Sequence, residues 1–588
     1  MSGHEWLTLV VVVAVVITMV RDLFPPAAAV LGGSIILLIT GVVTAEEAFS
    51  GFSNPAPLTI AALYVVAAAV TRTGLLRPVL TSALRSAQSD RTVLARLLPS
   101  VAAGSSVFNN TPIVAMLVPE VSNWAVRRGG SPSRFLMPLS FAAIAGGTIT
   151  LIGTSTNLVV SGLLEERTGE GFGFFAMTPV GLALAFGVVI ALVAFSGRLL
   201  PAHSSPQEDL TAASKEFFTE MIVRDGGALD GATVEGGGLR HLSGMFLVEV
   251  ERGEHSIAPV SPSLQLHGGD RLRFVGKAGD VVDLLDMPGL ESAHADQLTG
   301  FDLVRSDFFE AVVGPSSPLV GQTLRSSDFR SRYRAAVVAI HRDGTRIDAK
   351  LGDVRLRATD TLVLLAASGF RSLQNDRSDF LLVAPIGRPT VTDPRHRATV
   401  TVVTVGLIIL AATGLMPILN VSLLAGLVLV GFGVLAPSQA RDAIDLNVVL
   451  LVAGSFGLAA AMDTSGLADR IASGLVNATD VFGVVGVLAG VVVATIVLTE
   501  LISNAAAAVV VFPVAFAAAV DLGVDPVGFA VAVAVAASAS FLTPVGYQTN
   551  MMVFGPGGYR YRDYVRLGAP LSVFSLVVIV GLVNAIWL

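Results

Sequence analysis

Two short polar segments interrupt apolar stretches of the chain, and their residue types suit the binding of ions. The first segment runs from Ser105 to Pro112 and the second from Thr499 to Ala505. The free carbonyls and Ser or Asn oxygens at a helix break suit a hard cation such as sodium. The free N–H groups that begin the next helix suit an anion. A helix cap or a packing contact is the alternative for either segment alone.

A second kind of break follows each polar segment. Residues Gly153 to Asn157 form the first of these breaks, and Leu542 to Gly546 form the second. Gly and Pro interrupt a helix and free its carbonyls, while Thr and Asn can cap the broken ends. A simple packing kink would need the same residues. We expect both breaks to lie beside the polar segments.

Glu500 is the one acidic residue beside a polar segment. A buried acid at membrane depth is a candidate for proton or cation coupling. A structural acid that accepts hydrogen bonds from main-chain amides is the alternative. Since no Arg or Lys lies in the apolar stretches near the segments, helix ends and neutral donors must hold a bound anion. This arrangement favours partial neutralisation by sodium.

The two halves of the chain repeat at an offset close to 393 residues. Residues 108–111 match 502–505, and 153–157 match 546–550 in the same order. An odd number of predicted membrane crossings separates the copies, so they should have opposite orientations. Inverted repeats with broken helices at matching positions indicate a transport site near the membrane midplane.

The elements that must position these segments are membrane helices. The chain has 53% hydrophobic and 14% charged residues, and its apolar runs approach the roughly 20 residues that cross a bilayer. Two stretches, 92–124 and 480–520, are interrupted at their centres and fit re-entrant hairpins. Apolar spans are expected near 6–20, 27–43, 57–72, 136–163, 174–197, 398–413, 417–436, 446–463, 527–553 and 565–588. The fold class is therefore an α-helical polytopic membrane protein with about ten or eleven transmembrane helices.

Basic residues beside the spans predict the orientation. They follow the first and third spans and the first hairpin, end the fifth span, and precede the sixth and last spans (Arg21, Arg72, Arg77, Arg85, Arg91, Arg96, Arg127, Arg128, Arg134, Arg198, Arg395, Arg397, Arg560, Arg562 and Arg566). All become cytoplasmic if the N-terminus is outside the cell membrane. The first apolar run is expected to be a retained helix rather than a signal peptide.

A polar insert, residues 201–394, separates the membrane halves 1–200 and 394–588 and is expected in the cytoplasm. Its segments alternate in the manner of strands, as at 245–250 and 335–340, and a Gly268–Asp270 turn and an Asp343-Gly344 turn separate them. The pattern occurs twice, which predicts two small α/β domains at 205–290 and 300–375. Its arginines Arg325, Arg330, Arg332 and Arg334 are interpreted as a solvated face.

Several classes of protein are disfavoured. The chain has no cysteine, its eight histidines show no metal-ligand spacing, and no basic patch indicates nucleic acid. No nucleophile, base and metal constellation is visible, so an enzyme is the least favoured reading. No organic cofactor is predicted.

The paired segments resemble the divalent anion:sodium symporter family of the ion transporter superfamily, whose tips carry Ser-Asn-Thr. Here the tips read Asn109-Asn110-Thr111 and Ser503-Asn504-Ala505. The insert is similar to paired TrkA-C (RCK_C) domains, most clearly over 318–324 and 333–342.

The resemblance implies a homodimer that works as an elevator, co-transporting sodium ions. It implies a first sodium site from Ser105, Asn109, Asn110 and Gly153, and a second from Thr499, Ser503, Asn504 and Thr543. It implies substrate contacts from Asn110, Thr111, Thr154, Asn504 and Thr543. Because Ala505 lacks the expected hydroxyl, sulfate is favoured over a dicarboxylate.

The leading hypothesis is therefore sodium-coupled symport of a small divalent anion, regulated by the insert. A proton-coupled carrier or cation/proton antiporter using Glu500 is the alternative of the same class. A membrane anion sensor is the alternative of another class. Whether the insert binds a nucleotide, another small molecule, an ion or nothing stays open. Membrane lipid and the small anionic substrate are the other expected partners.

Overall fold

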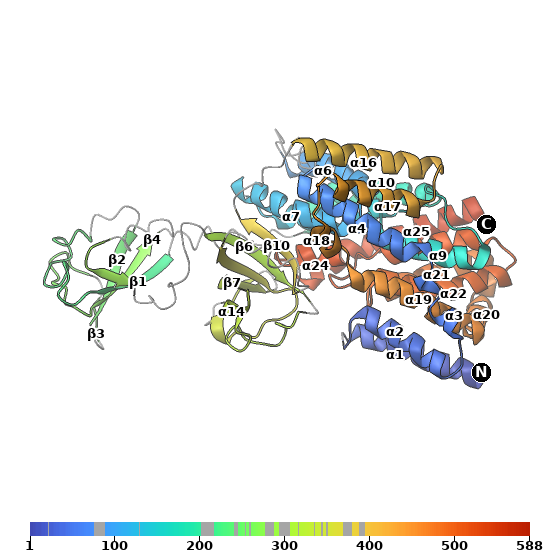
Figure 1. Ribbon diagram of the computed structural model, residues 1–588, viewed down its shortest axis with the longest axis horizontal. Coiled ribbons are helices and arrows are strands. Elements are labelled where there is room, and N and C mark those ends of the chain that lie inside the picture. The colour runs from blue at the N-terminus through green and yellow to red at the C-terminus, as the bar shows by residue number, and fades with distance from the viewer. Residues whose placement is uncertain are drawn as a thin grey trace.

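The computed structural model describes most of the chain, and Figure 1 shows a helical body from one end of which two sheets extend. The described residues are 1–21, 23–75, 89–128, 130–200, 217–239, 245–252, 255–257, 260–276, 287–292, 306–314, 317–333, 335–342, 345–347, 351–367, 379–386 and 394–588. Arg77, Arg85, Arg334 and the Asp343-Gly344 turn lie outside the described residues.

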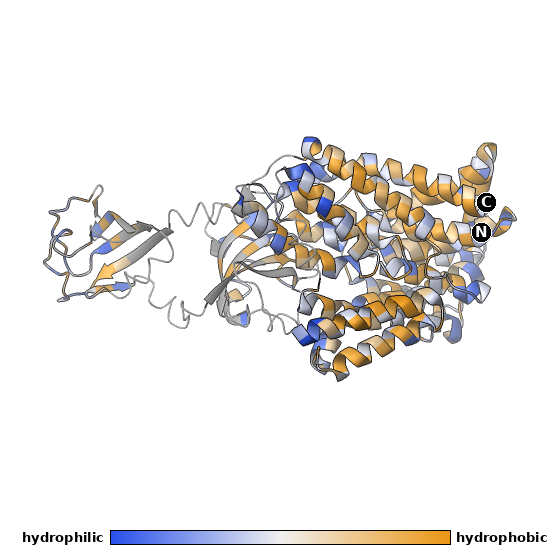
Figure 2. Cartoon of the chain, turned by 90° about the horizontal axis from the view of Figure 1, so that it is seen from above, coloured by the Kyte–Doolittle hydropathy of each residue, from blue (hydrophilic) through white to orange (hydrophobic). Residues whose placement is uncertain are grey.

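The helical body is that of a multi-pass membrane protein. Among the described residues, seven helices are long and apolar enough to cross a membrane: α1 (Gly3–Val20), α4 (Pro55–Thr73), α10 (Thr178–Leu199), α16 (Pro394–Thr413), α19 (Leu446–Thr464), α22 (Asn504–Asp521) and α25 (Tyr561–Trp587). Four shorter apolar helices accompany them: α2 (Pro26–Ile39), α17 (Ile418–Gly431), α21 (Gly483–Thr499) and α23 (Pro526–Ser538). Figure 2 shows hydrophobic residues over nearly the whole helical body.

Two pairs of helices meet at the polar segments. Helix α6 (Asp90–Ser105) is followed by α7 (Asn110–Arg127), and α21 is followed by α22. Only four residues separate the members of each pair. The breaks also lie where the glycines and prolines predict them. The first separates α8 (Ser133–Gly147) from α9 (Ser155–Thr168), and the second separates α23 from α24 (Gln548–Phe554).

The order of helices repeats along the chain. Helix α7 begins at residue 110 and α22 at residue 504, 394 positions later, while α9 and α24 begin 393 positions apart at residues 155 and 548. The packing is exchanged between the halves: α2 packs on α19 as α17 packs on α4, and α9 packs on α22 as α24 packs on α7. Helices of each half therefore pack against helices of the opposite half in an equivalent way. The opposite orientation of the halves remains a prediction.

Local signals explain where the helices α4 and α19 begin and end. The side chain of Asn54 accepts a hydrogen bond from the amide of Ala56 at the start of α4, and Asp445 caps α19 in the same way. Gly74 and Gly466 follow these helices with φ of 59° and 79°. Because glycine adopts positive φ without strain, the repeated Gly-Leu pairs mark helix ends.

The centre of the body consists of helices buried on all sides. Every residue from Gly528 to Ser538 of α23 is buried, and α8 is buried along nearly its whole length. By contrast, only 22% of α1 and of α16 is buried, as expected of helices that face lipid. The elements nearest the polar segments are thus the most enclosed.

Three further helices were not expected from the apolar runs: α3 (Ala45–Ala48), α18 (Pro437–Asp442) and α20 (Leu467–Thr479). The helix α20 buries Leu467, Ala468 and Ala472 and exposes polar residues on its other face. Because only one face is apolar, its composition does not stand out in a search for membrane spans.

The insert contains two sheets of the same design. The first comprises β1 (Phe217–Val223), β2 (Met245–Arg252), β3 (His255–Ile257), β4 (Arg271–Gly276) and β5 (Leu290–Ser292). The second comprises β6 (Ser306–Val313), β7 (Ala335–Arg342), β8 (Thr345–Arg346), β9 (Thr361–Ala367) and β10 (Phe380–Ile386). The strand orders are β3-β2-β4-β1-β5 and β10-β6-β9-β7-β8. Read in opposite directions, these orders are equivalent.

The two sheets also repeat one buried ion pair. Two nitrogens of Arg252 each donate to Asp270 at 2.7 Å, and Arg342 holds Asp360 at 2.8 and 2.7 Å, 90 residues later. Burial alone would raise the pKa of Asp270, but the hydrogen bonds from Arg252 and from the amide of His267 outweigh it. The pKa of Asp270 is therefore below its usual value.

The described residues of the insert are mainly strands. Strands β2 and β7 occupy the segments where alternation predicts them, and α14 (Phe329–Tyr333) is the α-helix among the described residues of the insert. The α/β character is therefore not confirmed. The second sheet continues past residue 375, because β10 pairs with β6.

The second sheet touches the helical body. Strand β10 packs against α7 and α24, and Val312 of β6 belongs to the hydrophobic core of the helical body. Gly555, which follows α24, faces the side chain of Thr361. Figure 1 shows the first sheet farther out, beyond the second.

Candidate functional site

The first tip, residues 105–111, is a closed group of polar side chains. Ser105 and Asn110 are fully buried, and the Ser105 hydroxyl donates to the Asn110 side-chain oxygen. The amide nitrogen of Asn110 donates to the hydroxyl of Tyr547 at 2.6 Å. Asn109 instead accepts a hydrogen bond from the amide of Thr111 and lies beside Tyr64 of α4. The first tip thus turns Asn110 inward and Asn109 towards α4.

The second tip, residues 499–505, repeats this arrangement. The hydroxyl of Thr499 lies 3.0 Å from the side-chain oxygen of Asn504, at the same five-residue separation as in the first tip. The same hydroxyl lies 2.5 Å from the carbonyl oxygen of Ala537. Ser503 precedes α22, and its buried hydroxyl oxygen has no hydrogen-bond partner among the described residues.

The helix breaks are held by matching hydrogen bonds. The side-chain nitrogen of Asn157 donates to the carbonyls ten and seven residues earlier, those of Gly147 and Thr150. Asn550 donates to the carbonyls of Ser540 and Thr543, again ten and seven residues earlier, at 3.0 and 3.3 Å. These asparagines satisfy carbonyls that the breaks leave free. They hold the two breaks in place; Asn157 was expected to cap a broken end, whereas Asn550 was assigned no role.

A third bond ties each break to its own tip. The hydroxyl of Thr150 donates to the carbonyl of Ser106, and the hydroxyl of Thr543 donates to the carbonyl of Glu500 at 3.2 Å. The repeat therefore extends to individual hydrogen bonds. As a consequence, both tips place equivalent oxygen atoms beside their helix breaks.

Oxygen atoms surround one glycine in each break. A Cβ atom on Gly153 would lie 2.9 Å from the carbonyl oxygen of Ser105 and against that of Gly147. A Cβ atom on Gly546 would lie 2.8 Å from the carbonyl oxygen of Thr499 and against the hydroxyl of Ser540. Because any side chain would fill this space, glycine keeps it open. Clustered neutral oxygens are suitable ligands for a hard cation.

The halves meet at Tyr547. Its hydroxyl lies 2.6 Å from the Asn110 nitrogen and 3.3 Å from the hydroxyl of Thr154. Beside it, Thr111 donates to the side-chain oxygen of Gln548 at 3.2 Å. The first tip therefore contacts both helix breaks directly. The N-terminal ends of α7, α9 and α24 converge here, which creates a favourable environment for an anion.

Glu500 is buried, and both of its carboxylate oxygens accept hydrogen bonds. One carboxylate oxygen accepts from the amide of Leu542 and the other from that of Thr543, both at 2.8 Å. The second oxygen also lies 3.0 Å from the position of a Cβ atom on Gly546. The equivalent residue of the first tip is Ser106, whose hydroxyl donates to the Ala103 carbonyl. A carboxyl group is therefore present beside one glycine and absent beside the other.

The structure thus brings the residues singled out from the sequence into two groups. Ser105, Asn110 and Gly153 form the first, with Thr154 and Thr111 at its edge, whereas Asn109 points away from it. Thr499, Asn504, Thr543 and Glu500 form the second, with Ser503 next to it. Sequence reasoning gave no role to Tyr547, Ser540 or Ser140, whose hydroxyl binds Thr549 and Asn550 across the halves. Tyr547 occupies the position that matches Thr154 in the repeat. This match is the sequence signal that could have identified Tyr547 as a site residue.

Paired interrupted hairpins and broken helices around buried polar groups, within a body of membrane helices, define a membrane transport protein. The chain belongs to the CitMHS (citrate transporter) family, whose model matches residues 12–536. This membership places it among transporters rather than enzymes.

Full-length relatives accompany the family match. The chain is 36% identical to the "Putative sulfur deprivation response regulator" of Chlamydomonas reinhardtii, over 96% of this chain and 98% of that protein. It is 35% identical to an uncharacterized transporter of Synechocystis sp., over 96% of this chain and 94% of that protein. It is 24% identical to the sodium/sulfate cotransporter 2 of Chlamydomonas reinhardtii, over 91% of this chain and 84% of that protein.

Proposed function

We propose that this protein is a sodium-coupled symporter of a small divalent anion, with sulfate as the favoured substrate. The observation that carries the proposal is the duplicated oxygen cluster, in which each tip and its break surround a glycine. Two equivalent clusters fit two sodium ions: one at Ser105, Asn110 and Gly153, the other at Thr499, Asn504 and the break near Thr543. Ser503 lies next to the second cluster, whereas Asn109 points away from the first.

The anion would lie between the two clusters. Neutral donors are available from Asn110, Thr111, Thr154 and Tyr547, and on the other side from Asn504 and Thr543. Two sodium ions would offset the charge of a divalent oxyanion, because the tips contain no basic residue. The aromatic ring of Tyr547 takes up space between the breaks, and Ala505 offers no hydroxyl. Both features favour a compact substrate such as sulfate over citrate or another carboxylate.

An elevator mechanism is consistent with where these residues lie. All of them belong to α6–α9, α21–α24 and their connections, whereas α1, α2, α16 and α17 contribute none. The bonds between Asn110, Tyr547 and Thr154 join the moving parts of both halves into one unit. We propose that this unit moves relative to the outer helices, that its halves are inverted, and that the protein is a homodimer.

A membrane anion sensor is the second candidate function, and one specific observation favours it. The relative that is 36% identical over nearly its full length carries the name of a regulator. In a sensor, the same site would bind the anion and report occupancy through the insert without moving it across the membrane.

Uptake by reconstituted protein separates these functions. We expect labelled sulfate to accumulate in vesicles only with an inward sodium gradient, and citrate and succinate to compete weakly. Sulfate binding without uptake under any gradient would identify a sensor. Uptake driven by a proton gradient without sodium would support the proton-coupled alternative, and uptake of citrate alone would change the substrate but keep symport.

We further propose that the insert regulates transport through the second sheet, which we assign to a TrkA-C-like domain in the cytoplasm. Strand β10 packs on α7 and α24, and each of these helices begins at the candidate site. Gly555 follows α24 with φ of −66°, so its backbone does not require glycine. Glycine instead allows the second sheet to approach the end of α24 closely, because a Cβ atom there would meet Thr361 and lie 3.3 Å from the Thr359 carbonyl.

Substitution of Gly555 tests this coupling. In the wild-type protein, adding sodium and sulfate should change the hydrogen exchange of β10, since the helices that support it move with the site. Gly555→Leu should separate the sheet from α24 and reduce that change at least about threefold, while the sheet itself stays folded. Gly406→Leu on α16, where a side chain meets open space, is the matched control. An unchanged response in Gly555→Leu would contradict the coupling.

A further inference from the structure

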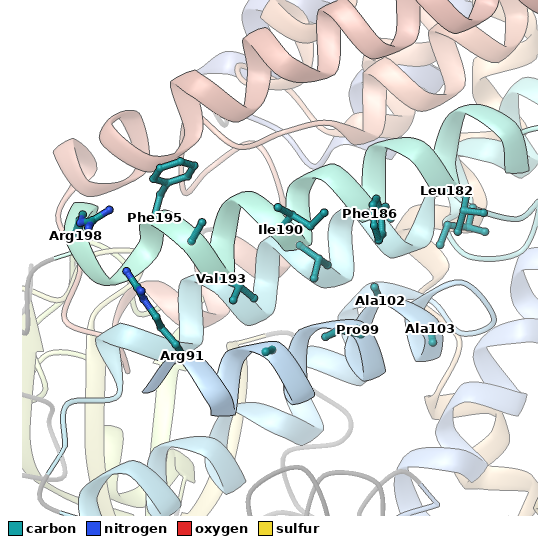
Figure 3. Close-up of a pocket in the computed structure, with 15 residues that line it drawn as sticks. Arg91, Pro99, Ala102, Ala103, Leu182, Phe186, Ile190, Val193, Phe195 and Arg198 are labelled. Atoms are coloured by element: carbon teal, nitrogen blue, oxygen red, sulfur yellow. The ribbon is translucent and has the colours of Figure 1, made fainter. Parts of the chain in front are cut away.

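An apolar groove with a volume of about 800 Å³ runs along the surface of the helical body, between α6 and α10. Figure 3 shows side chains of both helices lining it. Its inner end lies at Ala102, Ala103 and Ile149, next to the first tip and the first break. Its outer end lies at Arg91 and Arg198. The groove therefore runs from beside the first tip to a pair of arginines at the opposite end.

The groove has the length and chemistry of a lipid acyl chain. On α10 it extends from Leu182 to Arg198, which at 1.5 Å per residue is about 24 Å. The hydrocarbon part of one leaflet is about half of 30 Å thick, so the groove is long enough for an acyl chain of that leaflet. Phe186 and Ile190 are 69% and 51% exposed, on a helix apolar enough to span the membrane. Such an exposed apolar surface is stable when it contacts lipid hydrocarbon.

The outer end of the groove is positively charged. The side chains of Arg91 and Arg198 are exposed and lie at the same end in Figure 3. Neither makes a salt bridge within the described part of the chain. The nearest acid along the chain, Asp90, is already bound by Arg134 at 2.7 Å. Two uncompensated guanidinium groups are complementary to a phosphate group at the membrane surface.

We propose that this groove binds an anionic phospholipid of the surrounding bilayer. Its phosphate lies between Arg91 and Arg198, and one acyl chain follows the groove towards Ala103 and Ile149. A zwitterionic lipid would fill the same apolar space but gain less from two arginines, because its own cation opposes them. The bound chain would support the outer face of α6 beside the first tip. This assignment does not depend on which ion or anion the protein carries.

Native mass spectrometry of the full-length protein, extracted from vesicles containing about one quarter phosphatidylglycerol in phosphatidylcholine, tests the proposal. We expect the wild-type protein to retain phosphatidylglycerol in preference to phosphatidylcholine. The double variant Arg91→Gln/Arg198→Gln should reduce retention at least about tenfold, which corresponds to roughly 1.4 kcal/mol. Arg21→Gln, at the end of α1 and away from the groove, should retain lipid as the wild type does.

A second variant tests the apolar part of the groove. Ala95 lines the groove and is exposed, so Ala95→Phe should fill it while α6 stays folded, and retention should fall although both arginines remain. Equal retention of both lipids, or retention unaffected by either variant, would overturn the assignment. So would a change of oligomeric mass in Ala95→Phe without loss of lipid, which would identify the groove as an interface between copies of the chain.

Discussion

Replacing Asn110 with alanine is expected to abolish sodium-dependent sulfate uptake, lowering the rate at least about 100-fold. Its side chain is fully buried and joins Ser105 of the first tip to Tyr547 of the opposite half. Alanine removes an oxygen of the proposed cation cluster and a nitrogen of the proposed anion site. Each lost interaction costs about 1.4 kcal/mol, which lowers the rate about tenfold, so losing both accounts for a decrease of about 100-fold.

The loss should be one of binding rather than of folding. Removing the amide leaves partners unsatisfied, which costs about 2 kcal/mol of stability. Sodium stabilises the wild-type protein against heat if it binds the folded state, so the variant should lose this sodium-dependent shift in melting temperature. The equivalent change, Asn504→Ala, should give the same pattern through the second cluster.

Asn420 provides a matched control, because it lies exposed on α17 and makes no contact with the tips. Asn420→Ala should leave both uptake and the sodium-dependent shift unchanged. If Asn110→Ala transported within about threefold of the wild type at saturating sodium, the duplicated clusters would not be the cation sites.

The sequence predicted the parts of this site that have a local signature. A polar break inside an apolar stretch indicated the tips that hold Ser105, Asn110, Thr499 and Asn504, and Gly, Pro and Thr within apolar stretches indicated the helix breaks at Gly153 and Thr543. Each of these signals lies within about ten residues of chain, where helix capping and breaking are decided. The helix bounds and the strands at 245–250 and 335–340 rest on equally local patterns.

The remaining contacts depend on which segments fold together. Tyr547 looks like a packing residue in an apolar segment, and its partner Asn110 is 437 residues away. The packing of β10 on α7 is also invisible in the sequence, because a strand alternates in the same way whether its outer face meets water or a helix. Asn109 was placed in the first cluster by resemblance, but its side chain is held beside Tyr64.

The two clusters are equivalent in their main-chain geometry but not in charge. Ser106 and Glu500 occupy matching positions, and so do Gly147 and Ser540. The second cluster therefore gains a carboxylate and a hydroxyl that the first lacks, and the Ser540 oxygen has no partner among the described residues. In the proposed symporter, this difference should make the second cluster bind its sodium ion more tightly than the first. It also allows Glu500 to be tested separately from the rest of the site.

Replacing Glu500 with glutamine is expected to raise the sodium concentration for half-maximal uptake at least about tenfold. A negative charge about 4 Å from a cation is worth up to roughly 4 kcal/mol at an effective dielectric constant near 20, and a tenfold change needs only about 1.4 kcal/mol. Glutamine also presents a nitrogen to one of the amides that the carboxylate now accepts from, those of Leu542 and Thr543. The maximal rate should therefore fall as well.

Two comparisons distinguish a charge effect from damage to the break. Glu165→Gln, at an exposed position of α9, controls for removal of a carboxylate elsewhere. Thr543→Val removes the hydroxyl bond to the Glu500 carbonyl but keeps the charge, so it should raise the sodium concentration for half-maximal uptake less than Glu500→Gln does. If Glu500→Gln and Thr543→Val changed the rate alike and neither altered sodium activation, Glu500 would be a structural acid that holds the break. A larger shift in Glu500→Gln than in Thr543→Val would instead place its charge beside the transported cation.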